Sequence, residues 1–564
     1  MAIILTKEYR HWRYRIFAFT WLAYAGFYLC RKNISIAMPL LSQDQGFTKD
    51  NFAMVLFFYG LFYAIGQFYN GFLSDKFGPR LIVGIGLFLS ILANIFMGFG
   101  AALLVFGLWW CINGIGQSTG WSGTVKNMAP WFRRKERGVV MSWWATCYVI
   151  GAIVATALAT FIVTHPLLIR ASDLKNPSSL AIQLREDQNL LSKHLLEQFS
   201  PESRQLLSSY DGNSPVSEML LQAMVSELNS ILQGEWLYDK ERFAGIHLSD
   251  RTTKNIDRLL AKTPEQRKKD LKGKNRIYFN KTLLEETYPQ QFKSRWRRSF
   301  WIPSAVLMLI ALCFIKFTRN KPSDVGLPEI AEDDTDENIS AEDEKNYTNL
   351  SSKEILAVVL KNPIVWLISL MYFFTKMGRY ALLFWLPLYM VDGLGYNIAE
   401  AGYTSILYEA VGFVGVIAAG YVSDKLFQAR RMPVGALGMW GLAIVCLFHP
   451  KLAAWSHLGN AIGISLIGFF TYGPDALMSG AAAIDACSPK AAGLAAGVIN
   501  GVGSIGQMVS GFIVAYIAGK FGWDSLFYFF VAISFIAGCL LAIRWNWVPE
   551  AHKPASKNNS ESNL

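Results

Sequence analysis

The sequence GFLSDK occupies residues 71–76, and it returns in nearly the same form, GYVSDK, at residues 420–425. Each copy follows an apolar segment that is long enough for a membrane-spanning helix. A glycine lets the two helices at such a turn pack closely, and the aspartate and lysine can interact with neighbouring helix ends. The offset of 349 residues therefore predicts two related halves, arranged as parallel repeats around an axis along the membrane normal.

Outward from these turns, apolar segments recur along the whole chain. Of its 564 residues, 52% are hydrophobic and only 17% are charged. Because a bilayer-spanning helix needs about 20 mostly apolar residues, the sequence predicts twelve spans, at 14–42, 52–74, 80–99, 102–127, 138–164, 299–318, 363–392, 400–423, 433–450, 457–480, 491–518 and 523–547. A soluble core could not bury a dozen such segments. The predicted fold class is an all-α membrane protein with twelve transmembrane helices in two six-helix halves.

Positive charge is distributed as membrane topology requires. The formal net charge is +11, and with the N-terminus inside, the basic residues gather in cytoplasmic segments such as 7–15, 133–137 and 425–431. This positive-inside bias predicts that both termini are cytoplasmic, and it accounts for the net charge without a nucleic-acid partner. We expect a multi-pass protein of a bacterial inner membrane. A eukaryotic organelle, where Asn280 could be glycosylated, is the alternative.

Two polar regions interrupt the spans. Residues 165–298 predict a helix-rich polar insertion between spans five and six, on the outer side. A lid, a domain for an unidentified partner and a decoration without a role in transport all remain open for it. The acidic second region predicts a cytoplasmic linker. The expected domains are the first half with helices 1–5 at 1–164, the insertion at 165–298, helix 6 at 299–318, the linker at 319–362, the second half with helices 7–12 at 363–550 and the tail at 551–564.

The cysteine pattern and the soluble segments offer no catalytic chemistry. The seven cysteines lie in or at predicted spans and form no CxxC or metal spacing. Outside the spans, we find no nucleophile elbow and no phosphate-cradling glycine loop. We therefore expect no metal site, no cofactor and no enzymatic activity.

Two arginines occupy nearly equivalent positions in the repeat. Arg31 lies in span one, and an offset of 348 residues leads to Arg379 in span seven. A charge at mid-bilayer costs about 3 kcal/mol or more, so we expect both to serve the function, close to the axis and at mid-depth. Guanidinium forks match phosphate or carboxylate oxygens bidentately. The alternative is that Glu409 or Asp475 neutralises each arginine, which then only holds helices together.

Further candidates for binding the substrate lie in the same region. Tyr24, Tyr28 and Arg31 follow the spacing i, i+4, i+7, so one helical face could present all three. Lys376 lies one turn before Arg379 and could add positive charge. The remaining candidates in the spans are Tyr63, Tyr148, Tyr408, Glu409 and Tyr472. For the tyrosines the alternative is helix packing, and for Glu409 it is balancing Arg379 or Lys376 in the empty site.

The motifs that surround these residues resemble those of a known family. They include FYLCRKN at 27–33, WFRRKERG at 131–138, LYE at 407–409 and YGP at 472–474. The chain is similar to the organophosphate:phosphate antiporters of the major facilitator superfamily over all twelve spans, outside the 165–298 insertion. The resemblance implies that Arg31 and Arg379 bind substrate phosphate. It also implies that the two halves rock to exchange inorganic phosphate for glycerol-3-phosphate, hexose-6-phosphate or a phosphoglycerate across the lipid bilayer.

The same resemblance leaves the cargo and the role open. Glycerol-phosphate members carry a lysine where this chain has Gln67 and a histidine where it has Tyr148, and hexose-phosphate members carry an aspartate and a lysine within the segment that aligns with 498–504. Some members are membrane-bound sugar-phosphate sensors, which is one alternative. A proton-coupled organic-anion transporter, with Glu409 or Asp475 as the proton carrier, is another. One chain suffices for a pathway, so we expect a monomer.

Overall fold

The computed structural model describes residues 6–100, 102–132, 134–164, 170–171, 174, 176–186, 190–233, 248, 250–270, 283–284, 287–288, 295–328, 352–428, 430–486 and 489–547. All regular secondary structure in these ranges is helical. Three features of the sequence analysis lie outside them: the acidic run of the linker, the glycosylation sequon at Asn280 and the tail at 551–564.

The first half contains seven helices in the described residues. They are α1 (Lys7–Phe27), α2 (Asn33–Gln45), α3 (Lys49–Phe77), α4 (Pro79–Phe99), α5 (Leu103–Met128), α6 (Arg134–Thr164) and α14 (Arg298–Phe317). Local sequence sets their ends. Thr48 and Asn51 form a capping box at the start of α3. Gly78 adopts a left-handed φ of 86° between α3 and α4, and the following proline occupies the first turn of α4.

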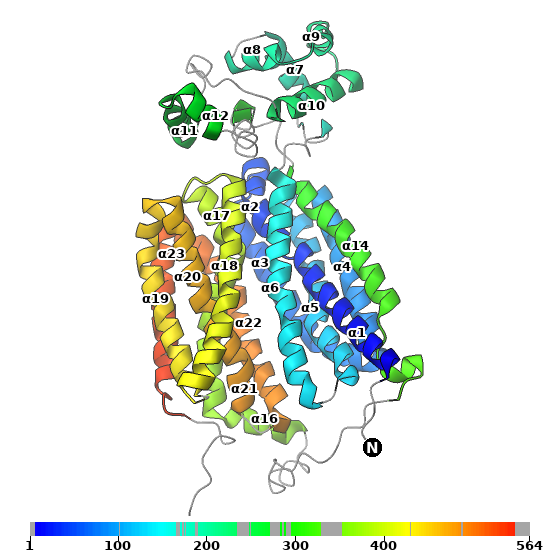
Figure 1. Cartoon of the computed structure of the whole chain (residues 1–564), viewed down its shortest axis with the longest axis vertical. Coiled ribbons are helices and arrows are strands. Elements are labelled where there is room, and N and C mark those ends of the chain that lie inside the picture. The colour runs from blue at the N-terminus through cyan, green and yellow to red at the C-terminus, as the bar shows by residue number, and fades with distance from the viewer. Residues whose placement is uncertain are drawn as a thin grey trace, which may run out of the picture.

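The second half repeats this pattern. Its helices are α16 (Ser352–Lys361), α17 (Pro363–Asp392), α18 (Ile398–Tyr421), α19 (Arg431–Trp455), α20 (His457–Ala476), α21 (Ala482–Asp485), α22 (Pro489–Lys520) and α23 (Trp523–Ala542). Asn397 and Glu400 form the capping box of α18. Short π-helical segments follow α18 and α20. The two halves stand side by side, with the first on the right and the second on the left in Figure 1.

Eight helices among the described residues are long and apolar enough to cross a membrane. They are Pro79–Phe99, Trp143–Thr164, Arg295–Phe317, Ile398–Leu426, Arg431–Trp455, His457–Gly480, Ala495–Lys520 and Trp523–Ala542. Helices also occupy the other four predicted ranges, namely those of α1 with α2, α3, α5 and α17. In α17, Lys376 and Arg379 lower the hydropathy. The count of twelve spans stays a prediction.

The first predicted span is interrupted, where we expected one continuous helix. α1 ends at Phe27 and α2 begins at Asn33, with a single 3-10 turn between them. Amide side chains of α5 accompany the break: Asn113 donates to the carbonyl of Cys30 at 2.8 Å, and Gln117 donates to that of Phe27 at 2.9 Å. Backbone carbonyls inside a membrane need such partners. The polar face of α5 therefore stabilises the break in span one.

The two halves contact each other at the end that carries the insertion. Lys49 at the start of α3 forms an ion pair of 2.8 Å with Asp392 at the end of α17. Nearby, the rings of Phe57 and Phe512 have centroids 5.2 Å apart. Gly402 of α18 lies so close to α6 that an added Cβ would lie 2.1 Å from the hydroxyl of Thr160. These contacts lie at the helix ends that the predicted topology places outside. With that orientation, the two halves are in contact on the outer side in this conformation.

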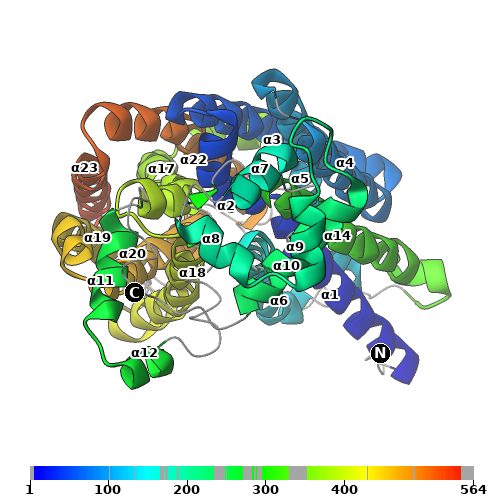
Figure 2. The same cartoon turned by 90° about the horizontal axis from the view of Figure 1, so that it is seen from above.

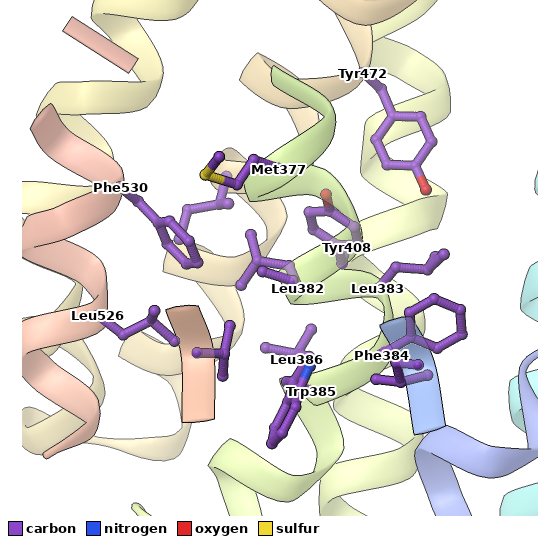
Figure 3. Packing of buried hydrophobic residues seen from close by; sticks show 14 of the residues in the cluster. Met377, Leu382, Leu383, Phe384, Trp385, Leu386, Tyr408, Tyr472, Leu526 and Phe530 are labelled. Carbon is purple, nitrogen blue, oxygen red and sulfur yellow. The ribbon is translucent and has the colours of Figure 1, made fainter. Parts of the chain in front are cut away.

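α17 is the centre of the apolar packing. Figure 3 shows Leu382 of this helix directed toward Phe530 of α23. The ring centre of Trp385 lies 6.4 Å from that of Phe52 in α3. All four side chains are buried. A helix packed this closely holds its polar residues in fixed positions, and Lys376 and Arg379 both belong to α17.

The insertion packs around a core of its own. Its described helices are α7 (Pro177–Glu186), α8 (Leu190–Glu197), α9 (Pro201–Ser208), α10 (Glu218–Gln233), α11 (Asp250–Leu260) and α12 (Pro264–Asp270). Leu184, Leu195 and Leu228 are among the buried side chains of its apolar cluster, which is separate from those of the bundle. The helices lie beyond the end of the bundle opposite the N-terminus (Figure 1), with α11 and α12 over the second half and α7 and α9 over the first (Figure 2).

Candidate functional site: a buried group of cations shared by both halves

Arg31 lies directly after the break in span one, and its side chain is buried with 4% exposure. Its Nε donates to the side-chain oxygen of Gln117 at 3.0 Å. Its guanidinium carbon lies 4.7 Å from the ring centre of Tyr28 and 5.3 Å from that of Tyr63. Within the described residues it has no carboxylate at ion-pair distance, and its Nη2 has no hydrogen-bond partner. Part of the guanidinium fork is therefore available for an anion.

Arg379 lies in the middle of α17, which is continuous at this point. Its Nη1 is 2.5 Å from the Oδ2 atom of Asp475 in α20. Its guanidinium carbon lies 4.5 Å from the ring centre of Tyr472 and 5.9 Å from that of Tyr148, which belongs to the first half. Neutralisation by an internal acid, the alternative considered for both arginines, occurs at Arg379 and not at Arg31 in this conformation.

The ring of Tyr380 also lies beside Arg379, with its centre 5.8 Å from the guanidinium carbon. Arg379 therefore contacts tyrosines of both halves, since Tyr148 belongs to the first half. Tyr380 was not among the predicted site residues, although it follows Arg379 directly in the sequence.

Glu409 is paired differently from our expectation. Its Oε1 lies 2.8 Å from the Nζ of Lys32, and both side chains are almost fully buried. Lys32 also donates to the carbonyl of Leu383 at 2.8 Å. Glu409 therefore balances a cation of the first half, and the prediction that it balances Arg379 or Lys376 is wrong for this conformation. Arg379 is paired with Asp475 instead, and Lys32, which follows Arg31 directly, reaches α17 and α18.

Lys376 is the fourth cation of the group, and it is buried with 8% exposure. Its Nζ donates to the hydroxyl of Ser504 at 3.3 Å and lies 5.1 Å from the ring centre of Tyr372. The group therefore holds four cationic side chains, Arg31, Lys32, Lys376 and Arg379, and two carboxylates, Glu409 and Asp475. Among the described residues, two of the four positive charges have no carboxylate at ion-pair distance.

The predicted tyrosines divide into two layers. Tyr28, Tyr63, Tyr148 and Tyr472 contact a guanidinium with their rings. Tyr24 instead packs against Trp121 and Trp144, with ring centres 5.4 and 5.5 Å away. The ring of Tyr408 packs against that of Tyr472 at 5.4 Å. Tyr24 and Tyr408 therefore support the first layer, as the packing alternative stated.

Lys32, Gln117 and Ser504 were not among the predicted site residues, and Asp475 was considered as a counter-ion or a proton carrier. Lys32 had a visible signal, since it is a second charge beside Arg31 in a span. Gln117 and Ser504 had none, because uncharged polar residues are common in spans. No group of three metal-ligating side chains occurs in the part of the chain that the structure describes.

Two halves of membrane helices around a buried group of cations are the layout of a solute carrier of the alternating-access type. The chain belongs to the Major Facilitator Superfamily, whose sequence profile matches residues 20–169, 290–476 and 461–563.

Particular relatives sharpen this assignment. The chain is 26% identical to the glycerol-3-phosphate transporter of Bacillus subtilis (strain 168), covering 96% of this chain and 94% of the relative. It is 24% identical to a probable hexose phosphate transport protein of Chlamydia pneumoniae (96% and 93% covered). It is also 24% identical to the membrane sensor protein UhpC of Escherichia coli (strain K12) (95% and 92% covered). The resemblance to organophosphate transporters is confirmed.

A solved structure supports the fold. The crystal structure of a bacterial homologue of the human lysosomal transporter Spinster, in an inward-facing and occupied conformation, matches with a TM-score of 0.59 over 98% of this chain and 100% of that one. The sequences are 14% identical, so this likeness concerns the fold alone.

Proposed function

We propose that the protein is a secondary active transporter that exchanges a phosphorylated organic anion for inorganic phosphate by alternating access. One observation carries the proposal: the group formed by Arg31, Lys32, Lys376 and Arg379 holds four cationic side chains against two carboxylates, Glu409 and Asp475. A phosphoryl group carries between one and two negative charges near neutral pH, and it presents oxygens in the geometry that guanidinium forks bind. Glycerol-3-phosphate, a hexose-6-phosphate and a phosphoglycerate all carry this group.

The charge excess explains why transport would be an exchange. In the empty protein, closing the site on both sides would bury two uncompensated cations at low dielectric, which is costly. A bound phosphate neutralises them and adds hydrogen bonds between the halves. The loaded protein can therefore pass through the occluded state, whereas the empty protein reorients slowly.

Arg31 and Arg379 have different parts in this scheme. Arg31 has a free Nη2 and is held by neutral groups, so it can accept phosphate without losing an ion pair. Arg379 offers an unpartnered Nε but shares its Nη1 with Asp475. Phosphate would compete with Asp475 for this second arginine, and the return of Asp475 would help to release the cargo.

The architecture we propose places this site midway through a bacterial inner membrane. The halves comprise residues 1–164 with 299–318, and residues 363–550. They supply twelve spans, with the insertion outside, the linker at 319–362 inside and both termini in the cytoplasm. Each protein would work as a monomer, because one chain contains both arginines.

Exchange of radiolabelled phosphate is the test. The purified protein is reconstituted into liposomes that are loaded with unlabelled phosphate, and uptake of external labelled phosphate is followed. We expect rapid uptake that unlabelled organophosphates inhibit. Absence of exchange by protein that is demonstrably folded would contradict the proposal.

A sensor is the second candidate, since a relative similar over almost its whole length is named a membrane sensor protein. The same site would then bind organophosphate and change conformation without flux. A protein whose melting temperature rises with organophosphate but that exchanges no phosphate would be such a sensor. Proton coupling gains no support from the structure, because Glu409 and Asp475 are both engaged in ion pairs.

A further inference from the structure

Lys376 is the buried cation whose role the arginine pair does not explain. Of the four cations in the site, Lys32 and Arg379 have carboxylate partners. Arg31 and Lys376 therefore carry the two excess charges. These two have different surroundings. Arg31 lies against Gln117 and two tyrosine rings of the first half, whereas Lys376 lies against Ser504 and Tyr372 of the second half.

The helix geometry fixes the spacing of the second pair. Lys376 and Arg379 are three residues apart in continuous α-helix, so they lie on one face, about 4.5 Å apart along the axis. Arg379 points toward α20, where it meets Asp475, and Lys376 points toward α22, where it meets Ser504. The two charges are thus separated within the second half.

The surroundings of the Lys376 ammonium stabilise its position but not its charge. The hydroxyl of Ser504 donates to the carbonyl of Asn500 at 2.8 Å, so its oxygen is left to accept from Lys376. Gly503 lets the lysine stem lie against α22, since a Cβ there would be 3.0 Å from Cδ of Lys376. One neutral hydroxyl cannot compensate a buried ammonium. The nearby carboxylate of Asp475 is already paired with Arg379, so Lys376 can bind a further anion.

We propose, on the basis of the proposed function, that Lys376 binds a carboxylate of the cargo while Arg31 and Arg379 bind its phosphoryl group. The cargo is then a phosphorylated carboxylic acid rather than a phosphorylated polyol. Two separated cations match a molecule with two separated anionic groups better than they match a compact phosphate. An ammonium is a point charge that suits one carboxylate oxygen, whereas the planar arginine forks suit phosphate.

Two small molecules test this assignment, because they differ at one carbon. In 3-phosphoglycerate a carboxylate replaces a hydroxymethyl group of glycerol-3-phosphate. We expect 3-phosphoglycerate to inhibit phosphate exchange by the wild-type protein at a lower concentration than glycerol-3-phosphate does. The difference should be up to about tenfold, which is what one charge-assisted hydrogen bond allows. Equal inhibition by both compounds, or stronger inhibition by glycerol-3-phosphate, would overturn the inference and leave the proposed exchange intact.

Substitution of Lys376 tests whether this residue causes the preference for 3-phosphoglycerate over glycerol-3-phosphate. The readout is the ratio of the two inhibitory concentrations within each variant, which does not depend on how much exchange the variant retains. Lys376→Gln is expected to bring the ratio close to one. Lys316→Gln, which changes a lysine that packs on Phe317 at the end of α14, is expected to leave it unchanged. A preference that survives in Lys376→Gln would contradict the assignment.

Ligand-induced stabilisation covers the case of a protein or variant without measurable exchange. In detergent, 3-phosphoglycerate should raise the melting temperature of the wild-type protein more than glycerol-3-phosphate does at the same concentration. If the protein exchanges no phosphate but shows this difference, the proposed exchange fails and the carboxylate site stands. If the two compounds stabilise it equally, the carboxylate site fails.

Discussion

Arg31 and Arg379 occupy equivalent positions of the repeat but have different surroundings. Arg31 follows a break between two helices and is surrounded by tyrosine rings and the amide of Gln117. Arg379 lies in an unbroken helix and is paired with Asp475. The two positions of the repeat thus carry the same charged residue, but they differ in backbone conformation and in the presence of a counter-ion.

The difference suggests a division of work. A cation held by neutral dipoles keeps its attraction for anions, whereas a cation in a buried ion pair must exchange one anion for another. On the proposed function, the first half supplies the constant part of the phosphate site and the second half supplies the part that can be switched. Substitutions of Arg31, Arg379 and Asp475 test this contrast.

The largest effect is expected for Arg31→Lys. A point charge cannot reproduce the two-pronged donation of the guanidinium, and no other described group of the first half offers that fork to phosphate. We expect phosphate exchange in proteoliposomes to fall on the order of 100-fold. Near-normal exchange by this variant would contradict the proposal that the Arg31 guanidinium binds phosphate.

Stability should separate the two arginines. Arg379→Gln leaves Asp475 buried without its partner, which we expect to lower the free energy of unfolding by about 2 kcal/mol. Arg31→Gln removes an uncompensated buried charge and should leave the stability unchanged or raise it. Melting temperatures in detergent measure both, and the double variant Arg379→Gln/Asp475→Asn should recover most of the loss. A larger loss in Arg31→Gln would reverse the comparison.

Removing the competitor of Arg379 should strengthen phosphate binding. In Asp475→Asn the second arginine no longer has an internal anion, so we expect half-saturation at a phosphate concentration about tenfold lower, together with a lower maximal exchange rate because release is slower. Asp524→Asn, at an exposed position in the first turn of α23, is the matched control. Weaker phosphate binding by Asp475→Asn would show that the carboxylate positions the arginine rather than competes for it.

Much of this site follows from the sequence. The repeat of the GFLSDK segment relates Arg31 to Arg379, and side chains of the first half contact both arginines. The pairing of the charged side chains does not follow, because it depends on which side chains meet between helices. Glu409 meets Lys32 rather than Arg379 or Lys376, and Arg379 meets Asp475. The spacing of residues along one span does not determine such contacts between spans.

The smallest effect is expected for the insertion. Its apolar core is separate from that of the bundle, and no residue of the cation group belongs to it. Replacing 176–288 by a short Gly/Ser linker should therefore change the rate of phosphate exchange by no more than about twofold, the range of ordinary surface changes. Loss of exchange by a deletion variant with an unchanged melting temperature would make the insertion a working part of the transporter.

The central claim is that an empty site with two excess cations cannot reorient readily, and it can be tested in one measurement. Liposomes containing the protein are loaded with labelled phosphate and diluted into medium with or without unlabelled phosphate. We predict that efflux is at least about tenfold slower without external phosphate, which corresponds to a barrier higher by about 1.4 kcal/mol or more. Equal efflux in the two media would show that the empty carrier returns freely and would contradict the account.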